Sequence, residues 1–246
     1  MELLKFISYN SYLLEGLKNQ TLYFNNIYNF NDPFEGIFRY KVSSDYNAFK
    51  KFFLGPFWGS RKDMDRTFNN KIEFEALINK RFVNAQHVKG VCCFSAESKV
   101  NDIIMWSNYA NRHKGICLIF DSDNLFVCKY KGKGPFILPS GPREVKYTDK
   151  YLDEDPLLKE LNSKTFLTTK FQQWSNEKEY RYISSAAGNY NFNPEKLIEI
   201  VFGLRILPEA KETIKKIVNK FYKTEIKYSK IIMEKRKFAL TKVEET

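Results

Sequence analysis

Apolar and polar residues near the amino terminus follow patterns that predict a strand, a helix and a second strand. Mostly apolar runs at 3–8 and 21–26 predict the strands, and the amphipathic stretch at 11–19 predicts the helix between them. The next segment, 28–36, combines Asn, Asp, Pro and Gly with aromatic residues, which predicts a loop ordered by its own side chains.

The middle of the chain continues with mixed elements. Residues 45–86 have charged and aromatic residues at helical spacing, and the apolar run at 90–96 predicts a buried strand. The segment 101–112 predicts a helix capped by Asn101, and an apolar strand follows at 115–121.

The second half of the chain predicts two helices and several strands. One helix extends from about Pro156 to Gln172, and the other begins near Pro208. A segment rich in Gly and Pro at 131–142 predicts a surface loop. Further strands are predicted at 125–130, 143–149, 198–206, 225–233 and 237–243. No repeat, linker or composition shift divides the chain, so we expect a single domain of mixed α and β structure.

Two carboxylates and an arginine alternate along one short segment behind Trp174. In a strand, Glu177, Glu179 and Arg181 would share one face, since neighbouring side chains point to opposite faces. Two like charges about 7 Å apart are costly. Either cations such as Arg181 and Lys178 neutralise them in a charge-paired edge strand, or the two carboxylates are retained for chemistry.

Composition and charge narrow the class of protein. The chain is 43% hydrophobic and 16% aromatic, which suffices for a core. No apolar run approaches the roughly 20 residues of a membrane span, and the amino terminus lacks a signal-peptide layout, so we expect a cytoplasmic protein with no membrane partner. A formal charge of +11 favours an anionic partner such as nucleic acid or a phosphate-rich cofactor. The alternative is that the lysines of the carboxy-terminal third only solvate a helix face and a strand edge.

Motifs for several common chemistries are missing from the sequence. The four cysteines lie in apolar runs without CxxC spacing, and the two histidines form no HExxH motif, so we expect no metal. The sequence also contains neither a P-loop nor a GxGxxG motif.

Five segments together resemble a bacterial and phage family known as domain of unknown function 2971 (DUF2971). They are found in the family's order at 30–35, 93–95, 105–120, 174–183 and 200–205. The layout of that family in turn resembles the ADP-ribosyltransferase fold. This second resemblance implies an α+β domain over 1–246, with a split mixed or antiparallel sheet, flanking helices and a helical insertion at about 45–86.

The resemblance to ADP-ribosyltransferases also implies NAD as substrate and roles for particular residues. Glu177 and Glu179 form the ExE motif of several such enzymes, and Lys5 stands on the first strand where those enzymes have histidine or arginine. Glu179 would stabilise the cation-like ribose of the transition state and bind its hydroxyls. Glu177 would orient or deprotonate the acceptor. Lys5 and Arg181 are the cations expected to meet the NAD pyrophosphate or an acid partner.

The other candidate cofactor-binding residues each have a structural alternative. Asn31 and Asp32 either bind a ribose or an amide, or form Asx turns that hold their loop. Tyr23 either stacks on nicotinamide or belongs to the core. Trp106 and its helix neighbour Tyr109 either line a pocket or are buried. For His113 at the end of the helix, the alternatives are a phosphate contact and a solvent-facing side chain.

The expected function is therefore an NAD-dependent ADP-ribosyltransferase-like enzyme that modifies nucleic acid or protein, in a toxin or phage-defence setting with a possible antitoxin or phage partner. One alternative is a non-catalytic basic module that binds nucleic acid or a phage component. The other is a hydrolase of NAD or ADP-ribose that uses the same pocket.

Overall fold

A computed structural model describes most of the chain. It covers residues 1–36, 38–40, 65–66, 69–70, 72–73, 76, 89–96, 99–127, 138–150, 152–154 and 163–245. The predicted helical insertion at about 45–86 lies almost entirely outside the described residues, so it stays a prediction. In the described part, no helix is long and apolar enough to cross a membrane.

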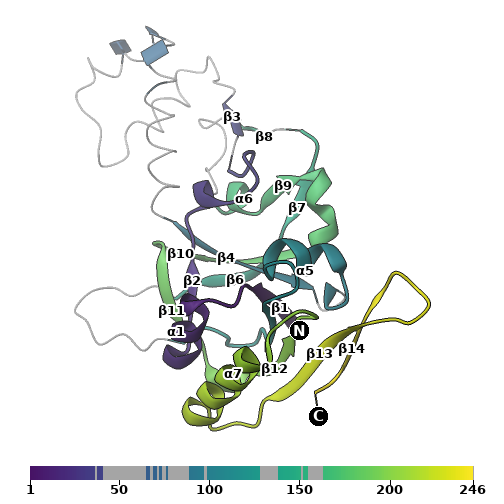
Figure 1. The fold of residues 1–246 in the computed structure, drawn as a ribbon. Helices are drawn as coiled ribbons and strands as arrows, with labels where there is room; N and C mark the ends of the chain where they lie inside the picture. The colour runs from purple at the N-terminus through teal and green to yellow at the C-terminus, as the bar shows by residue number, and fades with distance from the viewer. Residues whose placement is uncertain are drawn as a thin grey trace.

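A mixed eight-stranded sheet dominates the described part of the chain (Figure 1). Its spatial order is β14, β13, β12, β5, β1, β4, β10, β6. Only β12 and β13 pair in parallel within it, and the other neighbours are antiparallel. The strands are β1 (Glu2–Ile7), β4 (Gly90–Ala96), β5 (Ile116–Asp121), β6 (Ser140–Glu144), β10 (Glu179–Ser184), β12 (Leu197–Phe202), β13 (Lys227–Met233) and β14 (Leu240–Glu244).

Helices cover both faces of this sheet. On one face, α1 (Ser11–Asn19) and α7 (Pro208–Phe221) bury Leu17 and Ile214 in the larger core cluster. On the other face, α5 (Ile103–Tyr109) buries Trp106 in a second cluster. Because side chains alternate along β1, Leu3 belongs to the first cluster and Leu4 to the second.

Strands β1 and β4 pair over only two residues, fewer than any other neighbours in the large sheet. All six residues of β1 pair with β5, whereas only Leu3 and Leu4 pair with β4. Strand β4 instead pairs with β10 along Glu179–Ser184. The sheet is therefore continuous rather than divided into two separate halves, but β1 and β4 pair at one end only.

Three small sheets flank the large one. They consist of β2 (Thr21–Phe24) with β11 (Gly188–Asn191), β3 (Phe38–Tyr40) with β8 (Leu152–Glu154), and β7 (Lys146–Thr148) with β9 (Thr169–Phe171). After β2, Asn25 forms a bridge with Val91 at the start of β4. This bridge ties β2 to β4 beyond the point where β1 and β4 stop pairing.

Several predicted elements differ from the structure. The helix expected at 101–112 is shorter, and its cap is Asp102 rather than Asn101, because the Asp102 carboxylate accepts from the Ile104 and Met105 amides. The helix expected to reach Gln172 ends earlier, since α6 (Ser163–Leu167) is followed by β9.

The loop and strand expected at 125–142 also differ from the structure. In the described part of 125–130, Phe126 makes only an isolated bridge with Phe192. Strand β6 begins at Ser140, inside the predicted loop.

Candidate functional site

The segment that carries the carboxylate pair is only partly a strand. Glu177 ends the 3₁₀ helix η3 (Gln172–Glu177), and Lys178 adopts a left-handed conformation with φ of 44° before β10 begins at Glu179. The predicted alternation therefore applies to Glu179 and Arg181 but not to Glu177. Glu177 reaches the same place because the turn at Lys178 redirects the chain.

Five buried charged residues, which we call the ionic cluster, lie together behind this turn. They are Glu35, Lys170, Glu177, Glu179 and Arg181. The Lys170 ammonium lies 2.6 Å from Glu177, 3.1 Å from Glu179 and 3.4 Å from Glu35. Three carboxylates against two cations leave the cluster with one excess negative charge when all five groups are ionised.

Arg181 joins the cluster to three parts of the fold. Its guanidinium donates to both oxygens of Glu35, at 3.0 and 2.8 Å, and its Nε donates to Glu179 at 2.7 Å. It also donates to the Leu167 carbonyl at 2.7 Å and lies over the Phe30 ring. Because Arg181 is completely buried, it is not available to meet a pyrophosphate, whereas the other expected role, pairing with an acid, matches its contacts with Glu35 and Glu179.

The edge-strand alternative is also wrong in its details. Strand β10 lies inside the sheet between β4 and β6. Lys178 is exposed and makes no ion pair within the described residues, so Lys170 takes its predicted place as neutralising cation. The carboxylates are thus neutralised in part, but inside the fold rather than at its surface.

The two carboxylates experience opposite shifts in pKa. Burial alone would raise the pKa of Glu179, but Arg181 and Lys170 outweigh burial and lower it from 4.5 to about 2. Burial raises the pKa of Glu177, and the attraction of Lys170 offsets that effect only in part. Glu179 is therefore ionised at neutral pH, while Glu177 binds a proton more readily than an ordinary glutamate.

A cavity of about 350 Å³, the inner pocket, opens where β1 and β4 stop pairing. Its walls include Lys5 and Phe6 from β1 and Cys93 and Phe94 from β4. The polar side chains that line it are those of Lys5, Asn31, Ser95, Asn108, Tyr109, Lys170, Glu177 and Glu179. The carboxylate pair thus faces a cavity shared with the opening strand and with the loop of Asn31.

The inner pocket holds its polar groups in fixed positions. The Tyr109 hydroxyl donates to Glu177, and the Asn31 amide lies 3.5 Å from that hydroxyl. The Lys5 ammonium donates to the Cys93 carbonyl at 2.8 Å, across the gap between β1 and β4. Lys5 also contacts the Cys92 thiol, and since an ammonium has three donors, one donor is left for a ligand.

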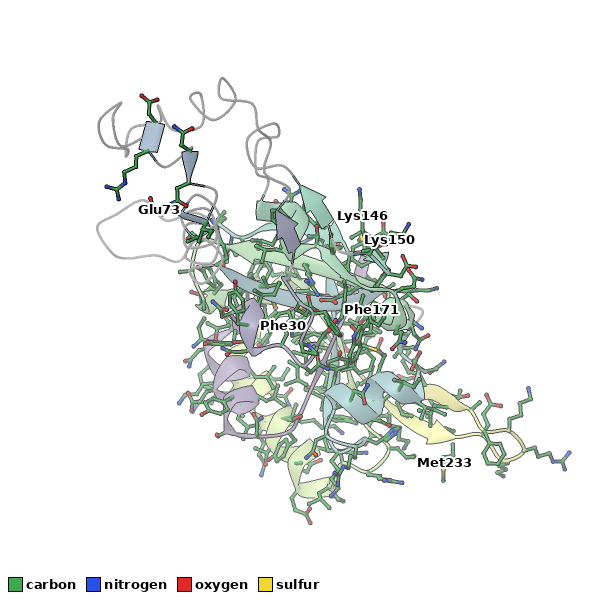
Figure 2. The ribbon with its side chains drawn as sticks, turned by 90° about the horizontal axis from the view of Figure 1, so that it is seen from above. Phe30, Glu73, Lys146, Lys150, Phe171 and Met233 are labelled. Carbon is green, nitrogen blue, oxygen red and sulfur yellow. The ribbon has the colours of Figure 1, made fainter. Side chains whose placement is uncertain are left out.

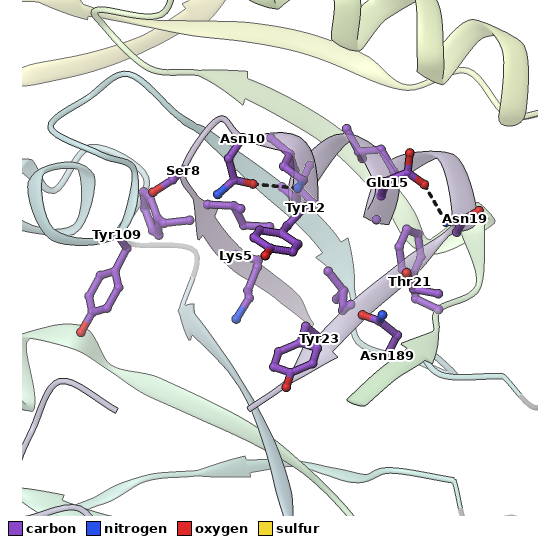
Figure 3. A pocket seen from close by; sticks show the side chains of 18 residues that line it. Lys5, Ser8, Asn10, Tyr12, Glu15, Asn19, Thr21, Tyr23, Tyr109 and Asn189 are labelled. Atoms are coloured by element: carbon purple, nitrogen blue, oxygen red, sulfur yellow. Dashed lines mark hydrogen bonds between the residues drawn. The ribbon is translucent and has the colours of Figure 1, made fainter. Parts of the chain in front are cut away.

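A second cavity of about 710 Å³, the outer pocket, adjoins the first (Figure 3). Lys5, Phe6 and Tyr109 line both cavities. The outer pocket extends between α1, β2 and β11, and the exposed rings of Tyr12 and Tyr23 flank it. In Figure 3, Lys5 extends into the space between Tyr23 and Tyr109.

The loop residues Asn31 and Asp32 have different surroundings. Asn31 is exposed and lines the inner pocket. Asp32 is buried, and its carboxylate accepts from the Phe34 amide at 2.9 Å, as expected of an Asx turn. Asp32 lines neither the inner nor the outer pocket, so the turn interpretation holds for this residue.

Trp106 and Tyr109 also have different surroundings. Trp106 is completely buried, its ring meets Phe6 edge to face at 5.1 Å, and its indole donates to the Val100 carbonyl. The core interpretation of Trp106 is therefore right, and its predicted binding role is wrong. Tyr109, three residues later, lines both pockets.

His113 lies outside both pockets. It is buried in the turn after α5, and its ring contacts the Ser107 hydroxyl at 3.2 Å. Burial and the nearby Arg205 lower the pKa of His113, which disfavours the protonated form that a phosphate contact requires. Burial contradicts the solvent-facing alternative, and the phosphate contact stays a prediction that the lowered pKa disfavours.

Sequence reasoning missed two residues of the ionic cluster. The pattern around Lys170 predicts a helix, whereas the residue lies on β9, which pairs with β7, so its position in the cluster was not predicted. Glu35 was present in the Phe30 to Glu35 motif but was given no role. Its partner Arg181 lies 146 positions away, and nothing in the local pattern signals that contact.

The fold and the site together define a class: a mixed α/β protein whose large sheet carries a buried carboxylate pair beside a pocket. A family model described as "Protein of unknown function (DUF2971)" matches residues 105–182. This match confirms the resemblance to the DUF2971 family, and the matched segment includes Tyr109, Lys170, Glu177 and Glu179. No curated protein and no solved structure matches the chain.

Proposed function

We propose that the protein cleaves the bond between nicotinamide and ribose in NAD and transfers ADP-ribose to an acceptor. The observation that carries this proposal is the pair Glu177 and Glu179, which are 6% and 3% exposed yet line the inner pocket. Both pockets fall within the ~300–1,000 Å³ typical of small-molecule sites.

The charge of the ionic cluster suits this reaction. When the glycosidic bond breaks, its electron pair leaves with nicotinamide and positive charge develops on the ribose. A fixed carboxylate in a buried site stabilises that charge, which exists mainly in the transition state. Glu179 fits this role because its pKa of about 2 keeps it ionised.

Glu177 fits the role of general base. Its raised pKa makes it a better proton acceptor than an ordinary glutamate, and Tyr109 and Lys170 hold both of its oxygens in place. As the acceptor's lone pair bonds to the ribose carbon, the acceptor's proton passes to Glu177. Two carboxyl groups whose pKa values are separated in this way are suited to different roles in one reaction.

The two pockets suggest how NAD is arranged. The reacting ribose lies in the inner pocket near Glu179, with Asn31 beside it. Lys5, at the junction of the pockets, meets the pyrophosphate with its remaining donor. The rest of the nucleotide extends into the outer pocket, where Tyr23 offers an exposed ring.

The direct test is release of nicotinamide from NAD by the purified protein, followed by analysis of where the ADP-ribose goes. Labelled NAD with DNA, RNA or bacterial lysate detects transfer, whereas free ADP-ribose alone indicates a hydrolase. If no nicotinamide is released at high enzyme concentration, and NAD does not raise the melting temperature, the proposal fails.

We expect the rate of ADP-ribose transfer to rise with pH through the raised pKa of Glu177, because a general base must be deprotonated. The Tyr109 hydroxyl lowers this pKa by donating to the carboxylate, so Tyr109→Phe should move the acid limb to higher pH. Glu177→Gln should remove that limb. The measurement is kcat/KM for transfer against pH.

Tyr23→Phe is the matched control for Tyr109→Phe, since Tyr23 lines the outer pocket and has no contact with Glu177 in the described structure. An acid limb that stays in place in Tyr109→Phe, or that moves equally in both variants, would assign the titration to a different group.

A further inference from the structure

The hairpin of β13 and β14 extends beyond the body of the protein (Figures 1 and 2). Its strands pair from Ser229 with Glu244 to Met233 with Leu240. The connecting loop is held by a backbone hydrogen bond from Glu234 to Ala239, at 3.0 Å, and by the Thr241 hydroxyl, which donates to the Glu234 carboxylate at 2.9 Å. The tip is therefore an ordered projection.

Three consecutive cations occupy this tip. Lys235, Arg236 and Lys237 are exposed, and none of them makes an ion pair within the described residues. Lysines on the strands of the same hairpin differ, since Lys230 pairs with Glu245 and Lys242 pairs with Glu199. Among the residues that the structure describes, the tip cations thus have no ion-pair partner, whereas Lys230 and Lys242 on the strands do.

Apolar side chains accompany these cations. Phe238 follows them directly and is fully exposed, and Met233 is 67% exposed. A fully exposed phenylalanine contributes nothing to the core, so the fold alone gives no reason for an aromatic residue at this position.

A groove of about 780 Å³ lies between the hairpin tip and the body. The body contributes Ile103 at the start of α5, His113 in the turn after α5, and Leu204 and Arg205 after β12. The hairpin contributes Met233, Glu234, Lys235, Arg236, Lys237 and Phe238. Four Lys and Arg side chains and a single carboxylate therefore line the groove, together with apolar groups.

We propose that this groove binds single-stranded nucleic acid, with backbone phosphates on the four cations and a base stacked on Phe238. Proteins that bind single strands combine a positively charged groove with exposed aromatic rings. Of two anionic partners, a flexible single strand can lie inside a groove between a hairpin and the body. A planar membrane surface cannot enter such a groove. The inference does not rest on the NAD chemistry, because the groove shares no lining residue with the inner or outer pocket.

Phe238→Ala is expected to weaken binding of a fluorescently labelled 20-nucleotide single strand by about 5- to 150-fold, measured by fluorescence anisotropy without NAD. Because Phe238 is fully exposed, its removal should leave the melting temperature unchanged. Glu179→Gln should bind the strand as the wild type does, which keeps this test separate from the catalytic proposal.

Replacing Lys235, Arg236 and Lys237 by glutamine should reduce the slope of log K against log salt by about 2, since each phosphate contact to a single strand contributes roughly 0.7. The matched control replaces Lys216, Lys220 and Lys223, three exposed lysines on and just after α7, and removes the same net charge. The control variant should keep a slope close to that of the wild type.

Three outcomes would overturn the inference. One is an equal loss of affinity in the two triple variants, which would mean that net charge alone drives binding. Another is tighter binding to a duplex of the same sequence than to the strand. The third is binding to anionic lipid vesicles with no binding to the strand at low salt.

Discussion

Glu179→Gln is expected to lower kcat for nicotinamide release from NAD by about 10²–10³-fold, a loss typical of removing one group that stabilises transition-state charge. The carboxamide has the same shape but cannot offset the positive charge that develops on the ribose. KM should change little, because the lost interaction acts mainly in the transition state. Single-turnover release of nicotinamide measures the effect directly.

The same substitution should leave the protein folded. Without Glu179, the ionic cluster retains the carboxylates of Glu35 and Glu177 against the cations Lys170 and Arg181, so its formal charges balance. Glu144→Gln, at an exposed position on the adjacent strand β6, is the matched control and should keep wild-type activity. Activity retained in Glu179→Gln would remove this residue from the proposed mechanism.

Local patterns predicted the elements that frame the site. The apolar run at 90–96 is β4, and the amphipathic stretch at 11–19 is α1. The prediction of α1 succeeds because one face of the helix packs on the sheet, which gives a helical period, and that of β4 succeeds because the strand is buried along most of its length, which gives a continuous apolar run. Since β1 and β4 were recognisable as strands, the walls of the inner pocket were largely predictable.

The ionic cluster was much less predictable, because its contacts are long-range. Lys170 lies on β9, a three-residue strand whose partner β7 is over twenty positions away, and three residues carry too little periodicity to outweigh a helical pattern. Glu177 was assigned to the right site for an incomplete reason, because the turn at Lys178 rather than strand alternation directs it inward. The alternation between Glu179 and Arg181 was correct, but nothing in the segment indicated that Arg181 pairs with Glu35.

Arg181→Met is expected to lower the free energy of unfolding by about 3–5 kcal/mol, the usual result of removing one partner of a buried ion pair. The substitution keeps an apolar side chain of similar length but leaves Glu35 and Glu179 buried with only Lys170 to neutralise them. Arg181→Lys should recover little, because an ammonium cannot reproduce the two parallel bonds to Glu35. Urea unfolding followed by circular dichroism gives the free energies.

A double-mutant cycle with Glu35→Gln then distinguishes two causes of this loss of stability: uncompensated buried charge and lost side-chain volume. If the cost of Arg181→Met comes from uncompensated carboxylates, neutralising Glu35 in that background removes one of them, so the double variant should be more stable than Arg181→Met alone. If the cost were only a packing defect, Glu35→Gln would add its own destabilisation to that of Arg181→Met. Additive losses would therefore contradict the electrostatic account, and they would mean that Arg181 stabilises β10 and its neighbours through shape rather than charge.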